Sequence, residues 1–218
     1  MLILAIDTST SAIAVGLTDG AGHTTSAARV DPRGHTEHLA PLVAQLLVGA
    51  GVTPGELTGI VVGTGPGPFT GLRVGMVTGL TMGLATGIPV HGVCSLDALA
   101  SQSTFRAGDE LLVATDARRN EVYWAHYRVI EGGIERLGGP AVDLPAEVPE
   151  ELRRLPTAGR GPLLYPAFFP VAVEPLDVDA GVMAELGARG IEHGWPMPVD
   201  ARYLRRPDAL TTAERNAR

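Results

Sequence analysis

The 218-residue chain carries a formal net charge of −7, and all 17 of its basic residues are arginine. The acidic balance argues against a free-standing nucleic-acid binder, because such binding depends on neutralising phosphates. The missing lysine excludes a P-loop lysine, a Schiff-base lysine and a Ser–Lys pair. Cys94 is the only cysteine, so an intrachain disulfide and a thiolate zinc cluster are excluded as well.

The first half of the chain predicts the order β-β-β-α-β-α, followed by a short strand. The first helix contains Pro41, which implies either a later start or a kink. No basic segment precedes the first strand, so we expect no signal peptide and a cytoplasmic protein. Glycines, threonines and Arg73 interrupt the apolar residues 71–90, which argues against a membrane span. In chain order, the elements are expected at 2–6, 13–17, 23–30, 37–50, 59–63, 70–86 and 88–91.

The second predicted helix has glycine at every fourth position. Gly71, Gly75, Gly79 and Gly83 fall on one stripe of the helix, and each glycine costs about 1 kcal/mol relative to alanine. A smooth groove against which another backbone packs closely would offset that cost. The opposite side is apolar too, with Val74, Val77, Leu80 and Leu84. Such a helix is typically buried on all sides.

The second half begins with the same pattern as the first. The segment LLVATDARRNEVYWAHY from Leu111 aligns without gaps with LILAIDTSTSAIAVGLT from Leu2, and Asp116 falls on Asp7 at the end of a hydrophobic strand. Any two buried strand pairs can be aligned in this way, but we predict an α/β fold of two duplicated β-β-β-α-β-α lobes, the second reduced. The boundary is placed near residues 97–109. The expected lobes span 1–99 and 100–218, the second with a turn-rich stretch at 130–143, a short helix at 148–154, a strand at 155–158, a helix at 179–192 and a basic tail.

Two turns that follow the aligned strands could carry chemistry. The first, from Asp7 to Ser11, offers hydroxyls, N–H groups and a carboxylate, which suit phosphate with a metal ion but are also common turn formers. In the second turn, the arginines after Asp116 could bind an anion or RNA phosphate, or pair with Glu121 or a partner carboxylate, and we favour the pairing. The residues of a residual nucleotide or phosphate site would be Asp7, Thr8, Ser9, Asp116, Arg118 and Arg119.

Two other motifs have competing interpretations. The run 63–71 leads from a strand into a helix, where N–H groups can bind an anion. Its two prolines remove two of those donors, and a rigid turn explains the run at least as well.

His35, Glu37 and His38 could hold a metal, but neither HExxH nor HxxxH occurs in the chain. We therefore expect a role at the helix start, and no metal site.

Five segments of the chain carry a family resemblance. They are LAIDTSTSAIAVGL at 4–17, HTEHLAPLV at 35–43, GTGPGPFTGLRVG at 63–75, DARRNEVYWAHY at 116–127 and PVDARYLRRPDA at 198–209. Together they resemble the bacterial TsaB family, glycoprotease-like proteins of the actin/sugar-kinase/chaperone ATPase superfamily. Pro68 stands where the family usually has serine, and residues 130–195 match poorly.

The resemblance implies an actin-like (ribonuclease H-like) fold and a role in tRNA modification. TsaB-like proteins are non-catalytic partners of a larger paralogue, TsaD, which transfers a threonylcarbamoyl group to the adenosine beside the anticodon of tRNAs that read codons starting with adenine. The small ATPase TsaE completes the machine. TsaD holds its metal through an HxxxH-type histidine pair, which this chain lacks. The resemblance therefore implies no intrinsic cofactor, and leaves open whether ATP or ADP with magnesium binds at an interface of the complex. It also implies that tRNA is contacted through the complex, and that the isolated chain forms a homodimer.

The predicted helices 37–50 and 70–86 have uncharged outer faces, and the family pairs through the helices of its first lobe. A soluble monomer rarely leaves such an apolar patch open, and methionines adapt to a partner's shape. Alternatively, the second lobe covers the patch. The competing functions are an ATP-dependent phosphotransferase or ATPase that uses Asp7 and Asp116, and a metallopeptidase. The expected interface residues are Ala40, Ala44, Val48, Leu72, Gly75, Met76, Gly79, Met82, Gly83 and Thr86.

Overall fold

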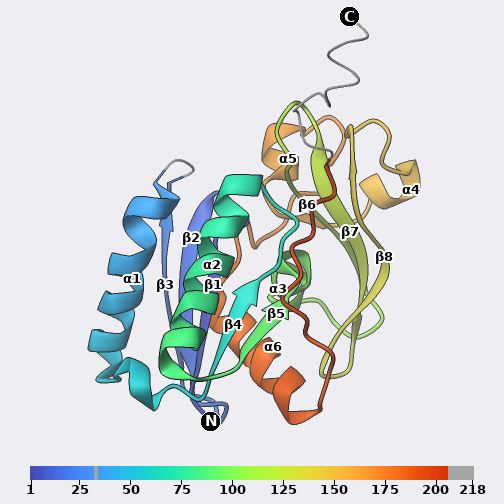
Figure 1. The fold of residues 1–218 in the computed structure, drawn as a ribbon. Coiled ribbons are helices and arrows are strands. Elements are labelled where there is room, and N and C mark those ends of the chain that lie inside the picture. The colour runs from blue at the N-terminus through green and yellow to red at the C-terminus, as the bar shows by residue number, and fades with distance from the viewer. Residues whose placement is uncertain (32–33, 206–218) are drawn as a thin grey trace, which may run out of the picture.

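The computed structural model describes residues 1–31 and 34–205, which form two β-sheets with helices on and between them (Figure 1). In the first sheet the strand order is β3-β2-β1-β4-β5. The first three strands form an antiparallel meander, and the last two run parallel to β1. The strands are β1 (Ile3–Asp7), β2 (Ala12–Thr18), β3 (Thr24–Val30), β4 (Gly59–Gly63) and β5 (Val90–Val93).

Two helices, α1 (His35–Ala50) and α2 (Phe69–Thr86), cover one face of the first sheet (Figure 1). α1 begins earlier than expected and keeps Pro41 inside it. Proline has no N–H, so the Glu37 carbonyl lacks its usual helical hydrogen bond. Both residues are exposed, and water can donate a hydrogen bond to that carbonyl instead. No helix in the described part of the chain is long and apolar enough to cross a membrane. Alternate strand residues pack against the two helices: Leu4, Ile6, Ile13, Val15, Ile60 and Val62.

The second sheet repeats the opening of the first but closes with shorter elements. Its order is β8-β7-β6-β9, in which β6, β7 and β8 are antiparallel and β9 is parallel to β6. Two four-residue helices accompany the two-residue β9, and they make the second lobe the smaller one. The predicted two-lobed α/β fold is confirmed. The elements are β6 (Glu110–Asp116), β7 (Val122–Ile130), β8 (Gly133–Asp143), α4 (Glu150–Arg153), β9 (Thr157–Ala158) and α5 (Gly161–Leu164).

Two helices lie between the sheets and join the halves of the chain. α3 (Ser95–Ser101) packs on the second sheet, whereas α6 (Ala180–Glu192) packs on the face of the first sheet opposite to α1 and α2. One continuous cluster of buried side chains includes both helices and both sheets. The close approach of α6 requires Gly16 on β2, because a Cβ atom there would lie 2.2 Å from the Ala180 carbonyl carbon.

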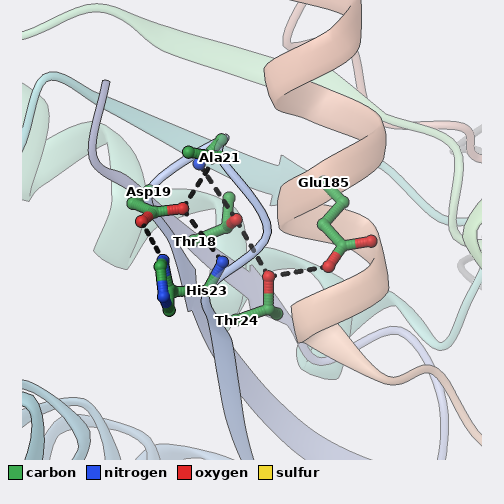
Figure 2. Close-up of polar contacts among 7 residues, drawn as sticks. Thr18, Asp19, Ala21, His23, Thr24 and Glu185 are labelled. Carbon is green, nitrogen blue, oxygen red and sulfur yellow. Dashed lines mark hydrogen bonds and ion pairs between the residues drawn. The ribbon is translucent and has the colours of Figure 1, made fainter.

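A hydrogen bond joins α6 to the hairpin formed by β2 and β3 (Figure 2). Thr24 Oγ1 donates to Glu185 of α6 at 2.7 Å. At the hairpin tip, the Asp19 carboxylate accepts the N–H groups of Ala21 at 2.7 Å and His23 at 3.1 Å. These N–H bonds lower the pKa of Asp19 to about 2. The carboxylate therefore stays ionised and keeps its bonds until the pH falls toward that value.

Three predictions about the second half are corrected by the structure. Residues 130–143, expected to be turn-rich, form mainly β8, and this strand accommodates its proline because it lies at the edge of the sheet. The expected boundary at 97–109 contains most of α3. The helix expected at 179–192 in the second lobe lies on the first sheet instead. A division after residue 99 therefore separates the two sheets but not the helices packed between them.

Candidate functional site

The carboxylate that ends β1 is buried. Asp7 is 0% exposed, and it accepts hydrogen bonds from the Ser9 N–H at 2.9 Å, the Ser9 hydroxyl at 2.8 Å and the Ser95 hydroxyl at 2.5 Å. Burial raises the pKa of Asp7, and the hydrogen bonds from Ser95 and Ser9 oppose that rise. A Cβ atom at Gly63 would lie 1.9 Å from Asp7 Oδ2, so β4 must carry glycine there. Protein groups thus enclose Asp7.

Asp7→Asn is expected to remove a pH-dependent cost of folding. Because its pKa is raised, the folded protein holds the Asp7 proton more tightly than the unfolded chain does. The wild-type free energy of unfolding should therefore fall as the pH rises from about 3.9, the unfolded value, through the higher folded value. The asparagine variant should lack this part of the curve. Urea denaturation of both proteins from about pH 3 to about pH 8 measures the difference, and parallel curves would contradict it.

The glycine stripe of α2 faces the chain's own first sheet. Thr8 Oγ1 donates to the Gly71 carbonyl at 2.7 Å and accepts from the Gly75 N–H at 2.9 Å, which joins the end of β1 to the helix. A Cβ atom would lie 2.4 Å from Thr8 Oγ1 at Gly75, and 2.3 Å from a Val62 methyl at Gly79. The groove expected for a partner's backbone is therefore occupied by β1 and β4.

The outer faces of α1 and α2 carry exposed apolar side chains. Val77, Leu80 and Leu84 of α2 are 57%, 44% and 87% exposed, and Val48 of α1 is 81% exposed. In the described residues the second lobe does not cover them. The prediction that α2 is buried on all sides is therefore wrong. With Ala40 and Ala44, which are also exposed, these four residues are called the outer apolar face. Of the other expected interface residues, the structure leaves Met82 and Thr86 half-buried and buries Leu72, Gly75, Met76, Gly79 and Gly83.

The second candidate turn has an unusual backbone. Residues 118–120 have φ angles of 63°, 53° and 62°, in the left-handed region that costs a non-glycine residue roughly 1 kcal/mol. The Arg118 N–H donates to Asp116 Oδ1 at 2.7 Å, and its guanidinium lies 3.0 Å from Asp116 Oδ2. Glu121, one partner expected for these arginines, instead binds Arg205 from the C-terminal segment. The expected pairing with Glu121 is therefore corrected, because Arg118 pairs with Asp116 of its own turn.

The two turns meet where the lobes touch, and they leave little space between them. Ser9 and Thr10 on one side face Thr115 and Asp116 on the other, around a cavity of about 10 Å³. The cavity itself has room for about one water molecule. Of the residues expected for a phosphate site, Ser9, Asp116 and Arg118 line the cavity, Thr8 lines a neighbouring hollow of about 140 Å³, Asp7 is enclosed, and Arg119 lies on the left-handed turn.

The two histidines at the start of α1 contact different groups. His35 Nε2 lies 3.3 Å from the Thr10 carbonyl oxygen, and His38 Nε2 lies 3.3 Å from Asp31 Oδ2. Glu37 between them is exposed. The histidines therefore join α1 to the neighbouring loops and do not converge on a common centre.

The C-terminal segment returns across both lobes, which the sequence did not indicate. Backbone hydrogen bonds join residues 197–202 to β5 and to the end of β4. Tyr203 then packs against Phe69 at the start of α2, and Arg205 donates to the Ala117 carbonyl of the second turn at 2.9 Å. In Figure 1 this segment is the red trace that rises past β5 toward β6. The rest of the predicted basic tail, 206–218, lies outside the described residues.

Known proteins are similar to this chain in sequence and in fold. Residues 29–170 match the family model for TsaD, tRNA N6-adenosine threonylcarbamoyltransferase. The Escherichia coli tRNA threonylcarbamoyladenosine biosynthesis protein TsaB is 33% identical over 94% of this chain and 95% of its own length. The solved structure of YeaZ from Pseudomonas aeruginosa superposes with a TM-score of 0.79 at 30% identity, covering 93% of this chain and 100% of that chain. An uncharacterized Mycobacterium leprae protein is 46% identical over 95% of this chain, which spans only 56% of that relative.

Proposed function

Because this chain belongs to the TsaB family of tRNA threonylcarbamoyladenosine biosynthesis proteins, we propose that it is a non-catalytic subunit that binds and activates the larger paralogue TsaD. Its involvement in this tRNA modification follows from the family; the partner role is our proposal. One observation carries that role, which is the outer apolar face of α1 and α2. Contiguous exposed apolar side chains on a globular protein mark a surface for another protein.

The geometry of the two turns supports a subunit without chemistry of its own. A phosphotransferase of this fold would need the Asp7 carboxylate to reach a metal-bound nucleotide. Here Ser9 and Ser95 enclose that carboxylate, and the cavity between the lobes holds about 10 Å³. The competing phosphotransferase hypothesis therefore gains no support. Any ATP or ADP with magnesium is proposed to bind at an interface of the complex.

The remaining parts of the proposal concern the assembly. We place TsaE in the same cytoplasmic complex, with tRNA bound by the assembled complex. Without TsaD, the outer apolar face is expected to pair two copies of this chain, because a two-fold contact uses one patch twice.

Omission of single components tests the proposal. The chain, TsaD and TsaE of the same organism are purified, complex masses are measured by light scattering, and modification of an unmodified tRNA transcript is followed with each protein left out. We expect a complex of this chain with TsaD, and no modification without either protein. Undiminished modification without this chain would overturn the partner role. Magnesium-dependent ATP turnover by the chain alone, abolished in Asp7→Asn, would overturn its non-catalytic character.

A further inference from the structure

We propose that this chain contacts the tRNA itself, through a cluster of arginine and aromatic side chains at the start of α2. The arginine–aromatic rim consists of Phe69, Arg73, Arg118 and Tyr203. Its guanidinium groups would pair with phosphates, and its rings would stack on unpaired bases. The inference rests on the proposed function, because tRNA is the substrate of that complex. It goes further in giving the non-catalytic subunit a share in holding the substrate.

Three side chains of the rim are stacked on one another. The Arg73 guanidinium carbon lies 3.9 Å from the centre of the Phe69 ring, and Arg73 Nε donates to Tyr203 Oη at 2.9 Å. The two ring centres are 5.1 Å apart. Phe69 and Tyr203 are nevertheless 53% and 44% exposed. The stack is thus ordered before a ligand arrives, which reduces the entropy cost of binding, and about half of each aromatic side chain remains open to solvent.

Arg118 belongs to the same edge of the molecule. It lines the hollow of about 140 Å³ together with Thr70, which follows Phe69 in α2. Its side chain is 53% exposed although it pairs with Asp116. The rim therefore includes the left-handed turn of the second lobe as well as the first helix turn of α2.

The charge of Arg73 is not balanced by a carboxylate in the described part of the chain. Its guanidinium group contacts the ring of Phe69 and the ring and hydroxyl of Tyr203. Glu121 of the second turn is already bound by Arg205. An incoming phosphate would therefore meet a guanidinium with hydrogen-bond donors to offer, held in position by two rings.

RNA fits this combination better than an acidic protein surface does. A carboxylate would use the guanidinium but leave the half-open rings without a partner. A nucleotide in a single-stranded loop presents both a phosphate and a flat base, which stacks on aromatic side chains. The net charge of −7 limits RNA affinity of the chain alone. The rim is therefore expected to strengthen tRNA binding by the complex, and not to bind tRNA strongly in the isolated chain.

Alanine variants of the rim test the inference in the complex with TsaD. An unmodified tRNA transcript is titrated at about 50 and about 200 mM salt, and complex mass is measured in parallel. Arg73→Ala should weaken tRNA binding about 5-fold or more and lower the salt slope by about 0.7–0.9, the loss of one phosphate contact. Tyr203→Ala should weaken binding about 5-fold or more while leaving the slope unchanged. Arg118→Ala, on the other lobe, should repeat the Arg73 result without disturbing the stack.

Matched controls lie at other surfaces. Arg106→Ala removes an exposed arginine before β6, at the opposite end of that strand from Arg118, and Trp195→Ala removes an aromatic side chain that is 48% exposed; neither should change tRNA binding. A photoreactive group, Tyr203→p-benzoylphenylalanine, should crosslink to the tRNA. Unchanged tRNA affinity in all three rim variants, or crosslinking to TsaD or TsaE in place of RNA, would overturn the inference. If no complex with TsaD forms, the proposed function fails instead, and the same variants titrated as isolated chains decide the rim separately.

Discussion

Gly79→Leu should destabilise the fold by about 3 kcal/mol or more, because it overpacks the contact between α2 and β4. Even a Cβ atom at Gly79 would lie 2.3 Å from a Val62 methyl and 3.3 Å from an Ile60 methyl, and both side chains are 0% exposed. The extra leucine atoms would force the helix away from the sheet. A loss of this size is a large part of the 5–15 kcal/mol typical of a domain. Urea denaturation followed by circular dichroism measures it.

Thr81→Leu is the matched control for this substitution. It places the same side chain two residues further along α2, at an exposed position, and should change stability by less than about 0.5 kcal/mol. If Gly79→Leu kept the wild-type stability and lost only its binding to TsaD, the glycine stripe would face outward and the packing described above would be wrong.

Leu84→Asp should leave the fold intact and weaken binding to TsaD. Leu84 is 87% exposed at the last turn of α2, so an aspartate there remains in water in the isolated chain. In a complex, the same carboxylate would be buried against an apolar partner. We expect affinity to fall about 30-fold or more, the effect of losing an interface residue worth about 2 kcal/mol. Leu80→Asp, one turn earlier on the same face, should add to the loss.

Leu163→Asp controls for the general effect of a charge on an exposed leucine. Leu163 is 57% exposed but lies on α5 in the second lobe, away from the outer apolar face. Light scattering and titration calorimetry with TsaD compare the variants, and thermal unfolding checks each fold. Wild-type affinity in Leu80→Asp/Leu84→Asp would locate the partner surface elsewhere.

Local patterns were sufficient to predict most of the two lobes. The gap-free alignment of the segments from Leu2 and Leu111 located both leading hairpins, since strand alternation and buried apolar runs are properties of neighbouring residues. The same alignment matched Asp7 with Asp116, and the structure places the two turns that follow them on opposite sides of one small cavity. β8 was missed because its glycines and proline favour a turn locally, while pairing with β7 stabilises the strand.

The candidate site shows the limit of this kind of prediction. Periodicity placed Gly75 and Gly79 on one side of α2 and Val77, Leu80 and Leu84 on another, and that division is correct. It assigned the glycines to a partner, whereas the structure packs them on Thr8 and Val62. Helical spacing specifies which side chains share a face, but not which neighbour that face meets.

Contacts between residues far apart in the chain account for the remainder. Arg205 reaches Glu121 across 84 positions and Tyr203 reaches Arg73 across 130, and no local pattern connects such pairs. The amino-acid order thus specified most of the elements, the duplication and the apolar character of α2. Long-range packing decides which face of α2 stays open, which sheet α6 covers and where the C-terminal segment lies. These features depend on how separate elements bury their apolar surfaces against one another, which no local pattern specifies.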